Sequence, residues 1–259
     1  MYVLGIDIET TVQRVDGKID GSPFNPENSI VSCGAQFLHD ETGQYFFFHH
    51  NKMECDPKKS YFELQQMLDL ADVIVAHNAK FDILWLQEAG FKIECAVYCT
   101  MIGEYILARG QKIPLSLEET AKRRNVTLKR SDLMEETFKK GIGYDDMDPD
   151  TVETYGRGDV VSCLEVYESQ MHDYRKPEFT GMRKVRDMMN EMMFVLIEME
   201  RNGICIDVDA LDDVEDEFTT ERNILQKRLY EIANKVMGDT PVNLNSPAQL
   251  SEVVYSRRI

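Results

Sequence analysis

Four acidic residues and one tyrosine are of the types that could together cut a phosphodiester bond. Asp7 and Glu9 lie in the segment YVLGIDIETT, Asp82 ends the segment VIVAHNAKFD, and Tyr155 and Asp159 belong to YGRGD. The first three lie beside apolar, strand-like runs, and the last two share one face of a predicted helix because they are four residues apart. Carboxylates placed in this way can converge at one end of a sheet. There they can hold divalent metal ions, which activate water for phosphodiester hydrolysis.

Each of these signals is weak when it is taken alone. Asp7 and Glu9 are two apart in a strand, so both side chains point the same way, and their like charges repel unless solvent or a cation neutralises them. An acidic pair at a strand end is most often solvated edge polarity. Asp82 follows a strand-to-helix junction, where Asp and Asn are favoured in any protein. The hypothesis therefore depends on the order and spacing of the whole set.

Hydrophobic periodicity predicts the elements that must position these residues. Alternating or β-rich runs predict strands over residues 2–8, 30–38, 44–50, 72–77 and 96–98. Helical patterns with capping signals predict helices over residues 61–70, 81–88 and 101–108, and further helices that begin at Ser116 and Asp148. Turn chemistry over residues 40–43 favours an antiparallel hairpin. The sequence thus predicts an α/β fold, a mixed sheet of about five strands with helices on both sides.

Two glycines lie in the helix that carries Tyr155 and Asp159. Gly156 and Gly158 weaken that helix locally, because glycine is a poor helix former. One interpretation is a kink or a close helix crossing, and the other is that something large must approach the backbone there. The sequence leaves both open.

The pattern changes around residues 174–180, where RKPEFTG shows no periodicity, and we expect a domain boundary there. Residues 1–175 are predicted to form the first domain, and residues 176–259 a helical segment. Within that segment we define the methionine stripe, a set of apolar residues at helical spacing: Met188, Met192, Val195, Leu196 and Met199. Such a stripe is far more often core or interface than a cofactor site. We expect these helices to be under-packed without a partner.

The composition restricts the function classes. The chain has 259 residues, of which 43% are hydrophobic and 29% charged, which predicts a packed core. No apolar run approaches the roughly 20 residues that span a bilayer, and the N-terminus lacks the features of a signal peptide. The six cysteines are thus expected to be reduced thiols in the cytoplasm, or in the host cytoplasm if a phage encodes the chain. The net charge of −17 argues against a protein that coats nucleic acid through a basic surface, but not against an enzyme that grips a strand end through metals.

Three motifs in this order resemble the exonuclease motifs of the DEDD superfamily: DIE at 7–9, NAKFD at 78–82 and YGRGD at 155–159. The tyrosine at 155 resembles the DEDDy branch, which contains the proofreading domains of DNA polymerases. LSLEETAKRR at 115–124 is also similar to the segment between the second and third motifs of this family. The resemblance covers residues 1 to about 172.

Two later passages resemble the DNA polymerase I-type enzymes of family A. They are MMFVLIEMERNGICIDVDAL at 192–211 and VNLNSPAQLSEVV at 242–254, which in that family lead from the exonuclease into the thumb of the polymerase domain. The palm and fingers motifs are absent, so we expect either part of a longer polymerase or one half of a naturally split enzyme. Because the first predicted strand follows Met1 directly, we expect no 5′ nuclease domain before it, an arrangement that resembles phage polymerases more than the bacterial repair enzyme.

The resemblance implies a ribonuclease H-like fold and 3′→5′ hydrolysis of DNA from a single-stranded 3′ end, releasing nucleoside monophosphates. It implies that Asp7, Glu9 and Asp159 hold one divalent ion, that Asp7 shares a second with Asp82, directly or through water, and that Tyr155 orients the attacking water. Magnesium is the expected ion because the ligands are hard oxygens, and manganese should substitute.

Asn78 and Phe81 are expected to contact the terminal nucleotide, by a hydrogen bond and by stacking. The alternative is that Asn78 is a helix cap and Phe81 a core aromatic.

Two rival functions stay open. One is a ribonuclease of the same superfamily, against which the NLNSP passage argues. The other is a non-catalytic docking subunit of a split polymerase, with residues 188–254 as the interface to a second polypeptide. The docking role is compatible with nuclease activity.

Overall fold

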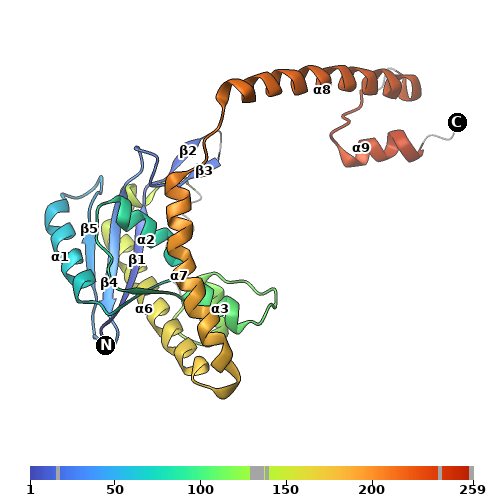
Figure 1. Ribbon diagram of the computed structural model, residues 1–259. Helices are drawn as coiled ribbons and strands as arrows, with labels where there is room; N and C mark the ends of the chain where they lie inside the picture. Colours follow the sequence, from blue (N-terminus) through green and yellow to red (C-terminus); the bar gives the residue numbers. More distant parts are fainter. Residues whose placement is uncertain (16–17, 129–136, 138–139, 239–240, 257–259) are drawn as a thin grey trace. The chain divides into compact units, whose positions relative to one another are not determined.

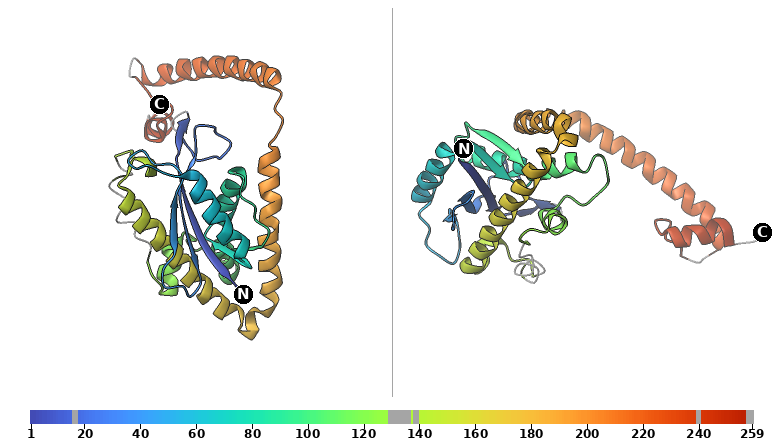
Figure 2. Two further views of the ribbon diagram at one scale, coloured as in Figure 1. Left: turned by 90° about the vertical axis from the view of Figure 1, so that its left-hand side faces the viewer. Right: turned by 90° about the horizontal axis from the view of Figure 1, so that it is seen from below.

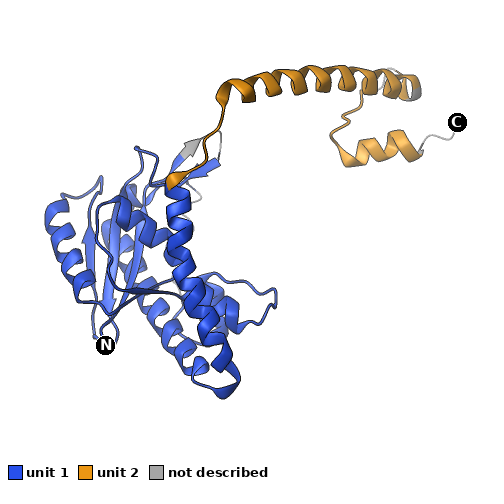
Figure 3. Cartoon of the chain, in the orientation of Figure 1, with its two compact units in different colours: residues 1–201 blue, residues 202–259 orange. Residues whose placement is uncertain are grey.

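The computed structural model describes residues 1–15, 18–128, 137, 140–238 and 241–256. The chain forms two compact units, Met1–Arg201 and Asn202–Ile259 (Figure 3). The strands of the first unit are β1 (Val3–Thr10), β2 (Gln13–Val15), β3 (Lys18–Asp20), β4 (Ile30–Phe37), β5 (Gln44–Phe47), β6 (Val73–Ala76) and β7 (Ala96–Cys99). Its helices are α1 (Pro57–Leu70), α2 (Ala79–Glu88), α3 (Thr100–Leu107), α4 (Leu117–Arg124), η2 (Tyr144–Asp146), α6 (Pro149–Tyr174), η3 (Pro177–Phe179) and α7 (Thr180–Asn202) (Figure 1).

The main sheet has five strands in the order β5-β4-β1-β6-β7. The central strand β1 runs antiparallel to β4 and parallel to β6, while β4 and β5 form an antiparallel hairpin and β6 and β7 are parallel. The predicted α/β class, the mixed sheet of about five strands and the antiparallel hairpin are therefore confirmed. The short hairpin of β2 and β3 was not predicted.

Side-chain alternation along β1 gives the sheet two different faces. Leu4, Ile6 and Ile8 belong to the larger core, which also contains buried residues of α1, α2 and α7. Val3 belongs to a second core, which it shares with buried residues of α4 and α6. Because successive side chains of a strand point to opposite faces, the odd-numbered residues of β1 face α6. The helices α2 and α6 flank the strands on opposite sides (Figure 2).

The helix starts follow the predicted capping signals. The Ser116 side chain accepts a hydrogen bond from the Glu119 amide at the start of α4. Asp148 accepts one from the Thr151 amide at the start of α6, where Pro149 occupies the first turn. The strand pattern and the caps together therefore orient α6, the helix that carries Tyr155 and Asp159.

The first compact unit continues well past residue 175, because α7 packs against it. Met193 and Ile197 are 2% and 0% exposed in the larger core. The Asn190 Oδ1 accepts a hydrogen bond of 3.0 Å from the Cys99 amide, and Lys80 forms an ion pair with Glu200. The unperiodic stretch at 174–180 is the corner between α6 and α7, which includes η3.

The second unit contains α8 (Val208–Met237), α9 (Pro247–Ser251) and the π-helical turn η4 (Glu252–Ser256). Among its described residues only Ala233 is a buried hydrophobic, and α8 exposes large apolar side chains such as Leu211, Phe218 and Leu225. Ser246 caps the start of α9, since its side chain accepts a hydrogen bond from the Gln249 amide. This unit therefore has little core of its own.

None of the helices that the structure describes is both long and apolar enough to cross a bilayer. The six cysteines are free thiols, and Cys33, Cys99 and Cys163 are buried.

Candidate metal centre

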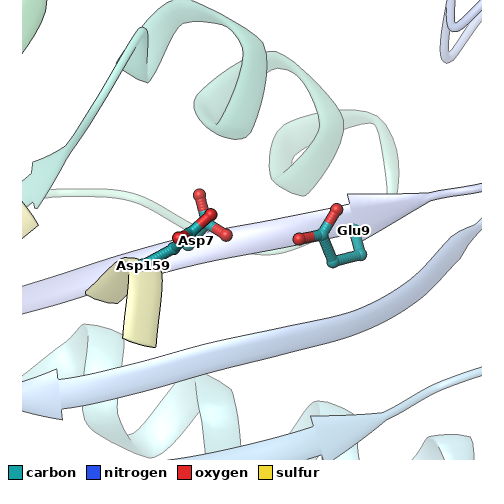
Figure 4. A group of neighbouring side chains, drawn as sticks. All are labelled: Asp7, Glu9 and Asp159. Atoms are coloured by element: carbon teal, nitrogen blue, oxygen red, sulfur yellow. The ribbon is translucent and has the colours of Figure 1, made fainter. Parts of the chain in front are cut away.

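Three of the four predicted carboxylates meet at the face of β1 that α6 covers. Asp7 and Glu9 project from β1 and Asp159 from α6, and each offers an oxygen that lies within 4.8 Å of the other two (Figure 4). Glu9 and Asp159 are 7% and 1% exposed, whereas Asp7 is half-buried. Like charges this close and this poorly solvated repel, and a cation between them removes the cost. Three hard oxygen donors suit a divalent cation such as magnesium.

Glycines let α6 approach the sheet closely enough for Asp159 to reach β1. A Cβ atom at Gly5 would lie 2.6 Å from Leu164 Cγ, and one at Gly34, the strand partner of Asp7, would lie 3.0 Å from Val160 Cγ2. A side chain at Gly5 would overlap Leu164, and one at Gly34 would crowd Val160, both of which lie on α6. The sequence therefore sets the separation of the carboxylates partly through residues that carry no chemistry.

The two glycines of α6 have different roles. A Cβ atom at Gly156 would lie 2.6 Å from Cε2 of the Tyr45 ring, so glycine is required there for a close crossing of helix and strand. A Cβ atom at Gly158 would have no neighbour within 4 Å. The close-crossing interpretation thus holds for Gly156, and the space beside Gly158 is open.

Asp82 lies next to the three carboxylates but is not one of the group that meets within 4.8 Å. It stands in the first turn of α2, is 3% exposed, and its Oδ1 accepts a hydrogen bond of 3.2 Å from the Ile8 amide, between Asp7 and Glu9. Burial raises the pKa of the Asp82 carboxyl to about 7, although hydrogen bonds from the Ile8 and Asp82 backbone act in the opposite direction. A cation nearby would favour its charged form.

Tyr155 lies one turn before Asp159 on α6 and is 4% exposed. It belongs to a small core with Met147 and Val152, against which the half-buried Tyr45 and Tyr144 pack. This core lies beside Glu9, whose charge acts on both Tyr45 and Tyr144.

Tyr144 is a residue of the site that the sequence reasoning missed. It stands in η2, its ring centroid lies 6.2 Å from that of Tyr155, and its hydroxyl donates a hydrogen bond to Glu9. Burial first, and then the negative charge of Glu9, raise the pKa of Tyr144 well above its usual value. No sequence signal marks this tyrosine, because it lies in a connection without periodicity.

Asn78 and Phe81 lie at the start of α2, at the carboxyl end of β6. Asn78 adopts a left-handed backbone conformation with φ of 62°, its side chain is exposed, and it makes no capping hydrogen bond. Phe81 is half-buried against the larger core, with its ring edge-on to Trp85 at 6.4 Å. The amide of Asn78 is thus available to a ligand, while Phe81 is at least partly a core residue.

A family model described as a 3′-5′ exonuclease matches residues 33–171. The chain therefore belongs to the 3′-5′ exonuclease domain family of family A DNA polymerases. The matched range contains Asp82, Tyr155 and Asp159, and the geometry of β1 adds Asp7 and Glu9.

Two similar proteins are DNA polymerase I enzymes of bacteria. The enzyme of Chloroflexus aurantiacus is 26% identical over 196 residues, which cover 70% of this chain and 19% of the relative. The enzyme of Bacillus subtilis is 21% identical over 217 residues, which cover 84% of this chain and 23% of the relative. The chain therefore spans less than a quarter of the length of these relatives.

A solved structure supports the fold. The POL domain of Pol1 from M. smegmatis, in complex with DNA primer-template and dNTP, has a TM-score of 0.62 at 17% identity, with 98% of this chain and 37% of that chain covered. The predicted family and the predicted ribonuclease H-like fold class are confirmed by these comparisons.

Proposed function

We propose that this chain hydrolyses single-stranded DNA from the 3′ end and releases nucleoside monophosphates, as the proofreading part of a DNA polymerase. The observation that carries the proposal is the meeting of Asp7, Glu9 and Asp159 within 4.8 Å, in a chain of the 3′-5′ exonuclease family. A member of this family with its acidic set assembled has the donors that metal-dependent phosphodiester hydrolysis requires.

The proposed cofactor is a pair of magnesium ions, which manganese can replace. Asp7, Glu9 and Asp159 would hold one ion, and Asp7 together with Asp82 the other. When bound, such ions lower the pKa of water and stabilise the charge of the leaving oxygen. The buried position of Glu9 and Asp159 keeps competing water away from the donors.

The remaining site residues would act on water and on the substrate. Tyr155, close to the carboxylates through its place on α6, would orient the attacking water with its hydroxyl. Asn78 would donate a hydrogen bond to the terminal nucleotide from its exposed amide. The exposed part of Phe81 would stack on the base, because every base offers a π face to an aromatic ring.

The proposed partner, besides DNA, is the rest of a polymerase, either in the same native chain or as a second polypeptide. Residues 176–259 would then form the start of the polymerase domain, as the resemblance of residues 192–211 and 242–254 implies. The methionine stripe fits an interface of this kind, since its members are 43% to 63% exposed.

The test is the digestion of end-labelled oligonucleotides by the full chain. We expect single-stranded DNA to shorten from its 3′ end with magnesium, more slowly when it is paired, and not at all in EDTA. Because the net charge is −17, EDTA should also remove most DNA affinity. Faster digestion of a matched RNA would favour the ribonuclease, and no digestion would favour the docking subunit.

A matched pair of variants separates the site from the fold. Asp7→Ala should abolish digestion, whereas Asp69→Ala, which removes an exposed carboxylate of α1, should leave it intact. Near-normal digestion by Asp7→Ala, or digestion from the 5′ end, would overturn the proposal.

A further inference from the structure

Tyr144 is held in place by a connection that is itself fixed to the first unit. The Asn51 amide donates a hydrogen bond of 2.9 Å to the Asp145 carbonyl, and the Asn51 side chain donates to the carboxylates of Asp145 and Asp146 at 3.2 and 3.0 Å. One residue further along the chain, Met147 is 3% exposed in the small core with Tyr155. The backbone that directly follows Tyr144 is therefore fixed by hydrogen bonds and by a buried side chain.

The Tyr144 hydroxyl is chemically suited to orient a carboxylate. A phenol keeps its proton at physiological pH and so can donate, and the acceptor here is the Glu9 carboxylate. Hydrogen bonds to ionised acceptors are roughly twice as strong as neutral ones. A carboxylate offers about four lone-pair sites, so one hydrogen bond leaves others for a cation.

Two features of Glu9 make a hydrogen bond that orients its carboxylate important: the irregular strand around it and the length of its side chain. It is followed by an irregularity in the pairing of β1 with β4, between Glu9 and Thr10, so the strand that carries it is distorted at this point. Its cross-strand partner Ser32 is completely buried and shares a hydrogen bond of 2.9 Å with the Tyr45 hydroxyl. Glu9 also has a longer side chain than Asp7, with one more torsion angle to fix.

We propose that Tyr144 is a positioning residue, which holds the Glu9 carboxylate in the orientation that binds a divalent cation. This inference rests on the proposed function of the carboxylate group. It gives the two tyrosines of the small core separate roles, since Tyr155 acts on water and Tyr144 acts through Glu9. Residues that orient metal ligands in this way typically change metal affinity or activity by about 10–100-fold when they are removed.

The experiment measures manganese binding to the full chain by calorimetry, without DNA. Tyr144→Phe keeps the ring and removes the hydroxyl, and we expect it to weaken binding at least about tenfold. The matched control is Tyr61→Phe, which removes a tyrosine hydroxyl that donates to the Gly90 carbonyl outside the site and should leave manganese affinity unchanged. In digestion assays, Tyr144→Phe should raise the metal concentration for half-maximal rate while a high concentration restores the rate.

A double-mutant cycle with Glu9→Gln shows whether the tyrosine acts through Glu9. In the Glu9→Gln background, Tyr144→Phe should cause no further loss of binding. Full additivity of the two losses, or wild-type affinity in Tyr144→Phe, would overturn the inference. Asp7→Ala in the same titration separates this failure from a failure of the proposed function, because unchanged binding in Asp7→Ala would overturn the metal centre itself.

Discussion

Alanine at Gly156 and alanine at Gly158 should change the stability of the first unit in opposite directions. Both positions lie inside α6, where glycine costs about 0.5–1 kcal/mol relative to alanine. At Gly158 the new methyl group meets nothing within 4 Å, so Gly158→Ala should raise the free energy of unfolding by that amount. This residue is the matched control for its neighbour.

At Gly156 the new methyl group would meet the Tyr45 ring at 2.6 Å from both Cε2 and the hydroxyl oxygen. The ring cannot move aside easily, because its hydroxyl contacts Ser32 at 2.9 Å and donates to the Val152 carbonyl at 3.2 Å. Overpacking of this kind costs about 1–3 kcal/mol. After the gain in helix propensity, Gly156→Ala should lose about 0.5–2 kcal/mol of stability, and the two variants should differ by the overpacking cost of about 1–3 kcal/mol, because the gain in propensity is common to both.

The assay is urea unfolding followed by tryptophan fluorescence. Trp85 is the single tryptophan of the chain and is 4% exposed in the larger core, so its emission reports on the first unit alone. In a Tyr45→Ala background, Gly156→Ala should no longer destabilise, since the obstructing ring is gone. Equal stabilisation by alanine at both glycines would refute the account of how α6 approaches the sheet.

Three further predictions concern the site, the boundary and acid stability. Tyr155→Phe should slow digestion by about 10²–10⁴-fold at saturating magnesium, which is a smaller loss than that of Asp159→Ala. Single-turnover rates that fall equally in the two variants would contradict the role of the Tyr155 hydroxyl. A non-specific protease in limiting amount should cut first within the exposed residues 203–207 and leave a core that ends near Arg201. If the first cuts fall at 175–180 instead, α7 is not part of the first unit. Burial of the Glu104 carboxyl would raise its pKa, but a hydrogen bond from Arg123 and the charge of Arg124 outweigh burial and hold that pKa below its usual value. The ionised Glu104 therefore stabilises the fold fully above about pH 4.3, the pKa of a free glutamate. This stabilisation is lost as the pH falls through the lowered pKa of the folded state. Glu104→Gln should therefore lower the melting temperature at pH 7 and converge with the wild type in acid, and an equal loss at both pH values would contradict the ion-pair account.

The sequence predicted the parts of the site that follow from local rules. The two-residue period of a strand places Asp7 and Glu9 on one face, and the caps at Ser116 and Asp148 place the helices. It could not predict contacts between segments that are far apart in the chain. The approach of Tyr45 to Gly156 and the hydrogen bond from Tyr144 to Glu9 are of this kind, and neither leaves a periodic pattern.

The extent of the first unit was also beyond local reasoning. Both faces of α7 carry apolar residues, so periodicity does not show which face is buried. The structure buries Met193 and Ile197 and leaves Met188 and Met199 56% and 63% exposed. The polar Asn190 on the buried face hid the pattern further, although its side chain satisfies the Cys99 amide at the edge of the sheet. The division into an exonuclease domain and the start of a polymerase domain at residue 175 stays a prediction. The compact unit of the structure extends to Arg201.

If the carboxylates of β1 and α6 form a metal-dependent nuclease site, they must bind metal in the crystal. Anomalous diffraction from crystals of the chain grown with manganese and a nucleoside monophosphate detects such ions. We expect one manganese peak held by Asp7, Glu9 and Asp159, and a second beside Asp7 and Asp82. Well-diffracting crystals without a manganese peak at these carboxylates, or with the ion held elsewhere, would contradict a metal-dependent site there.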